Sequence, residues 1–320
     1  MRSSEREFVE KVRREAARGA VRRSAGFALR QGIGDDCAIL SYSSQKDILV
    51  TTDFSLEKVH FRRDWQAAPS VGYKALARAF SDIAAMGGTP RYAFLSLALP
   101  KRLNQSWVQG FLKGFLQLAE AQKVTLAGGD TSASQNGVIA DVIVIGEVPR
   151  NQAVRRGGAR PGDEIWVTGT LGNAALALSL LRSGKKIRRP PVPFQVLFYP
   201  QPRLEIGRYL RRQKLATAMI DLSDGLSIDL ARLCAESGTG ARLVEEAIPR
   251  FPPTTLRQAL HGGEDLELLF TSPPERSPLL PKSLAGVSLT RIGKIIPGRK
   301  LWLVRDRKSY PLPVLGFQHF

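Results

Sequence analysis

Acidic residues are scarce in this chain, and five short segments concentrate them beside glycine or threonine and next to apolar runs. The sequence holds 29 Asp and Glu against 47 Lys and Arg in 320 residues. The five segments lie in both halves of the chain, at residues 34–36, 51–53, 128–130, 221–225 and 262–265. A fold that uses them together must bring distant parts of the chain to one place, where small residues let the backbone approach a ligand closely.

Each segment taken alone also has a purely structural explanation. Asp caps backbone N–H groups and Gly supplies positive φ, so a single Asp–Gly segment is usually a turn. The spacing of Asp221 and Asp224 fits a helix N-cap, and Asp82 within a predicted helix either faces solvent or points at a cation. Together, the segments favour a site for hard cations such as Mg²⁺, which take oxygen ligands and share them with substrate phosphates.

Length and composition predict a two-domain cytoplasmic protein, at about 150 residues a domain. Cys37 and Cys234 are the only cysteines, too few for a disulfide framework or a Cys-based zinc site, and they fit a reducing compartment. The longest apolar stretch, 138–148, is too short to span a membrane, and the first 30 residues have no apolar segment typical of a secretory signal.

The net charge of +18 raises the alternative of a basic nucleic-acid-binding protein. Short basic clusters lie at 22–23, 185–189 and 211–214, and none is interleaved with the aromatic residues of a base-stacking platform. A solvated basic surface, or steering of small phosphorylated ligands, explains these clusters better. Nucleic-acid binding therefore stays an alternative, which predicts steep salt dependence and no ATP turnover.

Hydrophobic periodicity predicts an α+β fold. We expect helices from Ser4 and at 70–86, 107–121, 173–182, 203–213 and 226–236, and strands at 38–40, 48–50, 92–99, 124–127, 138–148, 164–168, 216–220 and 266–271. The first half has no strict βαβ alternation, which favours α+β packing over a doubly wound sheet. The polar segment 150–162 marks the boundary between domains 1–149 and 150–320, and the Pro-rich segment 190–202 is expected to be a connection.

These motifs, in this order, resemble those of the thiamine-monophosphate kinases, in the ATP-binding superfamily of aminoimidazole ribonucleotide synthetase. The resemblance rests on residues 32–38, 51–53, 60–61, 73–77, 81–87, 128–131, 156–163, 167–170, 220–226 and 262–265. It implies the two-domain fold of that superfamily. An N-terminal domain with a mixed or antiparallel sheet would bind ATP and Mg²⁺ and form a homodimer through its sheet. An α/β C-terminal domain would complete the nucleotide and substrate site.

The resemblance also implies an activity, ATP-dependent phosphorylation of thiamine monophosphate to thiamine diphosphate with several Mg²⁺ ions. The implied metal ligands are Asp36, Thr51, Thr52, Asp53, Asp82, Asp130, Asp221 and Asp224. The implied ATP contacts are Gly129, Asp130, Arg156 and Ser223, and the implied thiamine site is formed by His60, Glu264 and Phe317. Phe317 offers a stacking face where the family often has Tyr or Trp, and Gln318 stands where relatives have Asp.

Phosphoryl transfer asks mainly for in-line positioning and for neutralisation of charge. The acceptor is itself a phosphate that is largely ionised near neutral pH, so no dedicated general base is expected. An alternative within the superfamily is a selenophosphate synthetase-like reaction. It is disfavoured because Cys37 lies in a predicted strand and Cys234 in a predicted helix, rather than in a nucleophilic loop.

Overall fold

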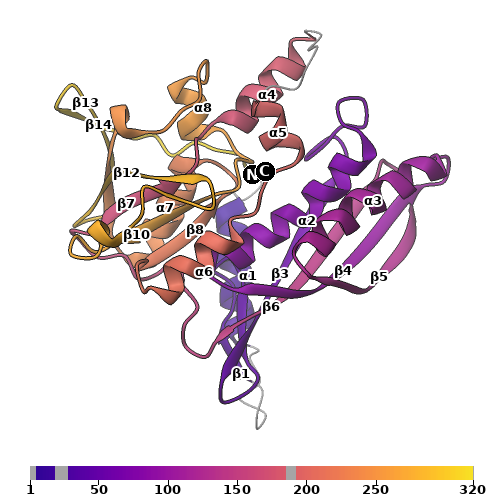
Figure 1. Cartoon of the computed structure of the whole chain (residues 1–320), viewed down its shortest axis with the longest axis horizontal. Coiled ribbons are helices and arrows are strands. Elements are labelled where there is room, and N and C mark those ends of the chain that lie inside the picture. The colour runs from indigo at the N-terminus through magenta and orange to yellow at the C-terminus, as the bar shows by residue number, and fades with distance from the viewer. Residues whose placement is uncertain (1–4, 19–27, 185–191, 320) are drawn as a thin grey trace.

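A computed structural model describes residues 5–18, 28–184 and 192–319 and confirms the α+β fold. In these residues the strands form two mixed sheets, one in each half of the chain (Figure 1). The predicted basic clusters at 22–23 and 185–189 lie outside the described residues. The last strand of the first sheet ends at Pro149 and the first strand of the second begins at Glu164.

The first sheet has the strand order β1-β2-β3-β6-β4-β5, antiparallel except for the parallel pair β4–β5. Its strands are β1 (Ala28–Gln31), β2 (Ala38–Ser41), β3 (Lys46–Leu56), β4 (Thr89–Pro100), β5 (Thr125–Ser134) and β6 (Ile139–Pro149). Two helices, α2 (Ala68–Ala85) and α3 (Gln105–Ala121), cover one face of this sheet (Figure 1). Along β6 buried and half-buried residues alternate, as expected for a strand with one covered face.

The second sheet has the order β14-β13-β9-β12-β7-β10-β8, with β11 paired to β12. Its strands are β7 (Glu164–Thr168), β8 (Ala218–Leu222), β9 (Gly240–Val244), β10 (Glu267–Ser272), β11 (Ser283–Leu284), β12 (Val287–Ile296), β13 (Leu301–Arg305) and β14 (Lys308–Pro311). The helices outside the first sheet are α1 (Glu5–Arg18), α4 (Asn173–Arg182), α5 (Val192–Phe198), α6 (Leu204–Arg212), α7 (Leu226–Ser237) and α8 (Leu256–His261), with short 3₁₀ turns at Glu245–Ala247 and Ser277–Leu279.

Helix α2 is the element that joins the two halves. Its many alanines favour a helix, and Pro69 fits the first turn because that position needs no backbone N–H. Leu76, Phe80 and Ile83 are fully buried in a core cluster that also includes Phe270 of the second sheet. The helix contacts β3 and β6 on one side and α6, β8 and β10 on the other. Side chains of α2 can therefore meet residues of both domains.

Helices α2 and α3 approach so closely that glycine is required at their contact. A Cβ at Gly72 would lie 1.9 Å from the Phe111 carbonyl oxygen, and one at Gly114 would lie 1.8 Å from the Pro69 carbonyl oxygen. Both distances are far below van der Waals contact, so any other residue would force the two helices apart. The position of α2 on the sheet is fixed by this backbone contact.

The structure corrects four local predictions. Residues 51–53 lie within β3 rather than just past a strand, and residues 128–130 lie within β5 rather than in a turn, because each strand pairs with its neighbour over its whole length. Helix α2 begins at Ala68, two residues before the predicted start of the helix at residue 70. The Pro-rich connection contains helix α5, whose Phe194 and Leu197 are buried against α4.

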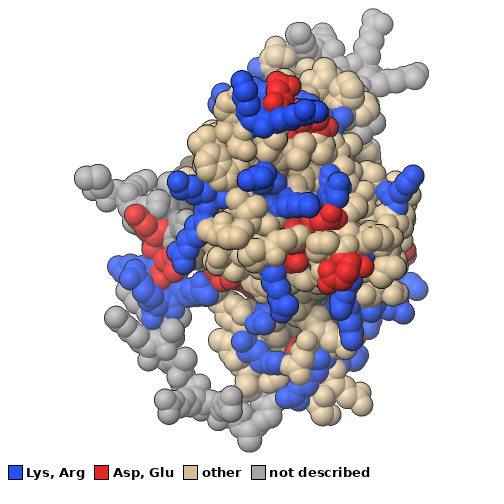
Figure 2. Space-filling model, turned by 90° about the vertical axis from the view of Figure 1, so that its left-hand side faces the viewer, with Lys and Arg blue, Asp and Glu red and all other residues tan. Residues whose placement is uncertain are grey.

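On the face of the molecule that Figure 2 shows, the positively charged side chains are dispersed rather than gathered in one patch. Figure 2 shows Lys and Arg side chains across the face of the second domain, with Asp and Glu side chains between them. No helix of the described residues is both long and apolar enough to cross a membrane.

Candidate active site

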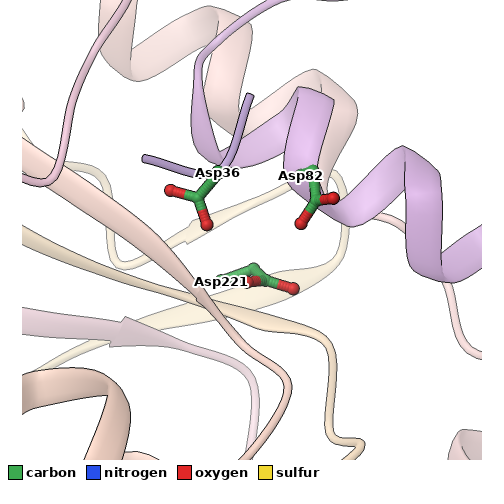
Figure 3. A group of neighbouring side chains, drawn as sticks. All are labelled: Asp36, Asp82 and Asp221. Atoms are coloured by element: carbon green, nitrogen blue, oxygen red, sulfur yellow. The ribbon is translucent and has the colours of Figure 1, made fainter. Parts of the chain in front are cut away.

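Three aspartates from distant segments meet between the domains. Asp36 precedes β2, Asp82 lies on α2 and Asp221 lies in β8, and one carboxylate oxygen from each lies within 4.8 Å of the other two (Figure 3). The Thr51 hydroxyl, on the covered face of β3, donates a hydrogen bond to Asp82. Four predicted metal ligands are thus brought together by the packing of β3, α2, β8 and the segment before β2.

The electrostatics of this cluster call for a cation. Burial and the neighbouring carboxylates raise the pKa of Asp82 well above its ordinary value, and burial and Asp36 do the same for Asp221. Carboxylates placed so close together repel one another when ionised. A divalent cation with oxygen ligands would remove this repulsion, so the residues present fit Mg²⁺.

Helix α2 carries a polar stripe of which only Asp82 was predicted from the sequence. Lys74, Arg78 and Asp82 are spaced by four residues, which places them on one face of the helix. The Lys74 ammonium donates to a Glu264 carboxylate oxygen at 2.5 Å, and the Arg78 guanidinium donates to an Asp53 carboxylate oxygen at 3.1 Å. Polar residues at i, i+4 and i+8 in an otherwise apolar helix were a readable signal in the sequence.

Arg156 lies at the same cluster. Its Nε and Nη2 donate to the two carboxylate oxygens of Asp36 at 3.1 and 2.9 Å, and its backbone N–H points to the Asp35 carboxylate at 3.3 Å. Such a bidentate pair is among the strongest side-chain contacts. A fixed guanidinium beside the carboxylates is in a position to meet a phosphate.

A cavity of about 470 Å³ opens beside the cluster, a volume in the range of small-molecule sites. One end is aromatic: the ring centroids of His60 and Phe317 are 6.2 Å apart, and those of Phe317 and His319 are 4.8 Å apart. Ser223, Asp224 and Glu264 also line it, so four of the predicted ATP- and substrate-binding positions, His60, Ser223, Glu264 and Phe317, share one cavity. Asp224 is held by Arg232 at 2.5 Å.

His60 is held as a neutral ring. Its Nδ1 accepts the Leu56 backbone N–H at 2.9 Å, and burial, together with Arg78, His319 and Lys74, lowers the pKa of His60 to about 3. The proton of the neutral ring therefore lies on Nε2, which is buried and has no hydrogen-bond partner among the described residues. Within the described part of the chain, this N–H is therefore an unsatisfied donor in the wall of the cavity that His60 lines.

The other predicted site residues lie apart from the cluster. Thr52 is on the uncovered face of the first sheet, where its hydroxyl donates to Asp141 at 2.7 Å. Gly129 and Asp130 are exposed in the edge strand β5, and Asp130 pairs with Ser96, whose side chain is on the uncovered face. The prediction that all eight metal ligands converge is thus not met by the described residues of one chain.

Neither cysteine has the surroundings of a nucleophile. Cys37 and Cys234 are 2% and 3% exposed, and burial raises the pKa of each thiol. A thiol acts as a nucleophile in its ionised form, which burial disfavours. This speaks against a selenophosphate synthetase-like reaction.

Comparisons with known proteins agree with this architecture. The family model of AIR synthase related proteins matches with its N-terminal domain at residues 34–148 and with its C-terminal domain at 160–305. The thiamine-monophosphate kinase of Bacillus subtilis is 34% identical, covering 90% of this chain and 93% of the relative, and that of Escherichia coli K12 is 36% identical, covering 93% and 94%. The structure of AaThiL complexed with AMPPCP and TMP matches with a TM-score of 0.84 and 32% identity, over 100% of this chain and 99% of that one.

Proposed function

Because the chain belongs to the thiamine-monophosphate kinases, built from AIR synthase related domains, we propose that it phosphorylates thiamine monophosphate with ATP to give thiamine diphosphate. The observation that carries this proposal is the buried carboxylate cluster beside a cavity with an aromatic end. The carboxylate cluster, with bound cations, suits the anionic reacting groups, and the aromatic end of the cavity suits the rings of the acceptor. The AaThiL structure, similar over the whole chain, contains AMPPCP and TMP, which supports the same pair of ligands here.

We propose that the cluster holds Mg²⁺. The ligands would be Asp36, Asp82 and Asp221, with Thr51 and Asp53 beside Asp82 and Asp224 near Asp53. Bound Mg²⁺ would neutralise charge on the nucleotide and acceptor phosphates. The Thr51 hydroxyl orients Asp82 by its hydrogen bond, and Arg156 orients Asp36 by two.

At the aromatic end, His60, Glu264 and Phe317 would bind the acceptor. The Phe317 ring offers a face for stacking on a heteroaromatic ring. The His60 Nε2–H would donate to an acceptor nitrogen, and the Glu264 carboxylate, held by Lys74, would lie beside the positive charge of the thiazolium. At the carboxylate cluster, Arg156 would contact ATP, and Ser223 would contact it from the wall of the cavity. No side chain need act as a general base, because the acceptor phosphate is ionised near neutral pH.

We propose further that the chain forms a homodimer through the uncovered face of the first sheet. Phe54 and Tyr92 are 56% and 51% exposed on that face, and Ile143 and Ile145 lie between them on β6. An exposed apolar sheet face of this kind is typical of an interface. Symmetric pairing of the same face on two copies would cover it.

The dimer would also explain where Thr52, Gly129 and Asp130 act. Strand β5 is at one edge of the sheet and β1 and β2 are at the other. A two-fold axis parallel to the strands would set β5 of one copy opposite β1 and β2 of the other. Asp130 would then face the partner near the segment that carries Asp36, so each site would take residues from both copies.

The reaction is tested directly by incubating the protein with ATP, Mg²⁺ and thiamine monophosphate, with free thiamine as a competing acceptor. We expect thiamine diphosphate from the monophosphate and no product from thiamine. Removal of Mg²⁺ by a chelator should abolish turnover. Product from thiamine alone would contradict the substrate assignment, and turnover without a divalent cation would contradict the role of the cluster.

The place of the reaction follows from its substrate. We propose that it takes place in the cytoplasm, where ATP is available. Both cysteines are free and buried, which agrees with a reducing compartment.

A further inference from the structure

Arg78 is the least exposed of the cations that line the described part of the cavity. The cavity is lined by four such residues, and Lys58, Arg62 and Arg182 are exposed at its rim. The side chain of Arg78 is only 15% exposed. It lies on α2 one helical turn before Asp82, at the passage from the aromatic end of the cavity to the carboxylate cluster.

The Arg78 guanidinium has unused hydrogen-bonding capacity. Its Nη2 donates to Asp53 at 3.1 Å and its Nη1 to the Phe54 carbonyl oxygen at 3.2 Å. A guanidinium has five N–H groups, so three remain without a partner among the described residues. Lys74, the neighbouring cation on α2, is less available, because its ammonium is held by Glu264 at 2.5 Å and its side chain is 4% exposed.

The charge around Arg78 explains why a cation is needed at this point. Asp53, Glu264, Asp224 and Asp82 all lie near enough to act on its charge. An acceptor phosphate that enters from the aromatic end must pass these carboxylates, and it would be repelled without a compensating cation. A planar guanidinium with free N–H groups matches the geometry of a phosphate.

We propose that Arg78 binds the phosphate of the acceptor and so makes the site select a phosphorylated over an unphosphorylated acceptor. This inference rests on the proposed function. It assigns to Arg78 a task that the aromatic end cannot perform, because the rings of the two acceptors are the same. Asp53, in turn, orients the guanidinium through its hydrogen bond.

The test is equilibrium binding of thiamine monophosphate and of thiamine to the full chain by calorimetry, without nucleotide. We expect the wild-type protein to bind the monophosphate more tightly. In Arg78→Met the preference should fall by about 10- to 100-fold, the range for a lost hydrogen bond to a charged group. The affinity of Arg78→Met for thiamine should stay within about 3-fold of the wild type. Arg78→Lys keeps the charge but not the two-pronged set of N–H donors, so its preference for the monophosphate should be intermediate.

Arg62→Met is the matched control, the same change at the exposed rim, where Arg62 pairs with Asp64. It should leave the preference unchanged. Arg78→Gln provides a second variant if Arg78→Met does not fold, as judged by thermal unfolding. An equal loss of affinity for both acceptors would mean that Arg78 only holds Asp53, and would overturn the inference.

Failure of the proposed function gives a different result. A wild-type protein that makes thiamine diphosphate from the monophosphate while Arg78→Met keeps its full binding preference overturns the role of Arg78 alone. A wild-type protein that binds thiamine as tightly as the monophosphate overturns the phosphate subsite. Absence of turnover in the wild-type protein with ATP and Mg²⁺ overturns the proposed function itself.

Discussion

At the scale of the residue, the raised pKa of Asp82 links metal binding to stability. The folded protein holds the Asp82 proton more tightly than the unfolded chain does, so the metal-free protein loses stability as pH rises above the ordinary carboxyl range. The loss is about 1.4 kcal/mol for each pKa unit. We therefore expect metal-free Asp82→Asn to unfold at a higher temperature than the wild type at pH 8, and the difference to shrink toward pH 5.

Scanning calorimetry in the presence of a chelator measures this difference. Asp306→Asn, at an exposed position, is the control and should unfold like the wild type at both pH values. Added Mg²⁺ should raise the unfolding temperature of the wild type more than that of Asp82→Asn. An Asp82→Asn protein less stable than the wild type at pH 8 without metal would show that the carboxylate is stabilising in the empty cluster.

His60 gives a second prediction at this scale. Its pKa is lowered to about 3, so the ring should stay neutral, protonated on Nε2, from pH 8 to pH 5. Because the unfolded chain binds this proton with the ordinary pKa of about 6.5, the folded protein should lose stability as pH falls from about 6.5 toward 3. Nitrogen NMR of the imidazole, assigned with His60→Gln, follows the ring directly, and a titration near pH 6.5 would disprove it.

Most of the acidic residues of the site could be predicted from the sequence, but two of its basic side chains could not. The family resemblance named Asp36, Asp82 and Asp221 together as metal ligands, and their carboxylates do meet. Lys74 and Arg78 were missed, since long basic side chains on a helix are usually solvated. Only the packing of α2 between two sheets turns them inward.

At the scale of the element, the contact of α2 with α3 sets the geometry of the site. A Cβ at Gly114 would lie 1.8 Å from the Pro69 carbonyl oxygen, so Gly114→Ala should displace α2 and cost at least the 1–3 kcal/mol typical of overpacking. Gly110→Ala, one turn earlier on α3, is the control. Its Cβ would meet the Ala68 Cβ at 3.0 Å, a contact that a shift of a few tenths of an ångström relieves, and alanine gains helix propensity, so its effect should be smaller than that of Gly114→Ala.

Denaturant unfolding and turnover measure both effects. We expect Gly114→Ala to lose activity beyond its loss of stability, because Lys74, Arg78 and Asp82 move with the helix. Equal stability and turnover of the two alanine variants would mean that α2 and α3 can move apart without disturbing the site.

Element type was more predictable than element length. The alternation of apolar residues predicted most strands and helices, but β3 and β5 extend beyond the apolar runs through 51–53 and 128–130. Pairing with β6 and β4 extends them, and pairing between distant strands has no local signal. In β5, Gly129 permits the close approach, since a Cβ there would lie 1.9 Å from the Leu95 carbonyl oxygen.

At the scale of the whole molecule, the proposed homodimer predicts that charged substitutions on the uncovered face of the first sheet will separate the two subunits. The double variant Phe54→Glu and Tyr92→Glu should be monomeric by light scattering and should lose activity, because charges in an apolar interface are costly. Leu279→Glu, at a position 66% exposed in the second domain, is the control and should keep the oligomeric state of the wild type. A monomeric wild type would contradict the proposal.

A shared site makes a sharper prediction. Asp130→Asn and Asp221→Asn proteins, each inactive alone, should regain activity when their subunits are mixed. After random exchange about half of the dimers contain one subunit of each variant. In each of these mixed dimers one of the two sites has both Asp130 and Asp221, so about a quarter of all sites, and about a quarter of wild-type turnover, should be recovered. Mixtures that stay inactive, with subunit exchange shown by mass spectrometry, would place Asp130 and Asp221 in the same copy's site.

The stripe on α2 has a consequence for how this enzyme can diverge. Lys74, Arg78 and Asp82 all lie on helix α2, which packs against α3 through glycines. A substitution that shifts the helix to change the position of one of them therefore also moves the other two. Natural variation toward other phosphorylated acceptors is therefore expected to accumulate on the part of the cavity wall formed by the C-terminal segment, around residues 317–319, rather than on α2.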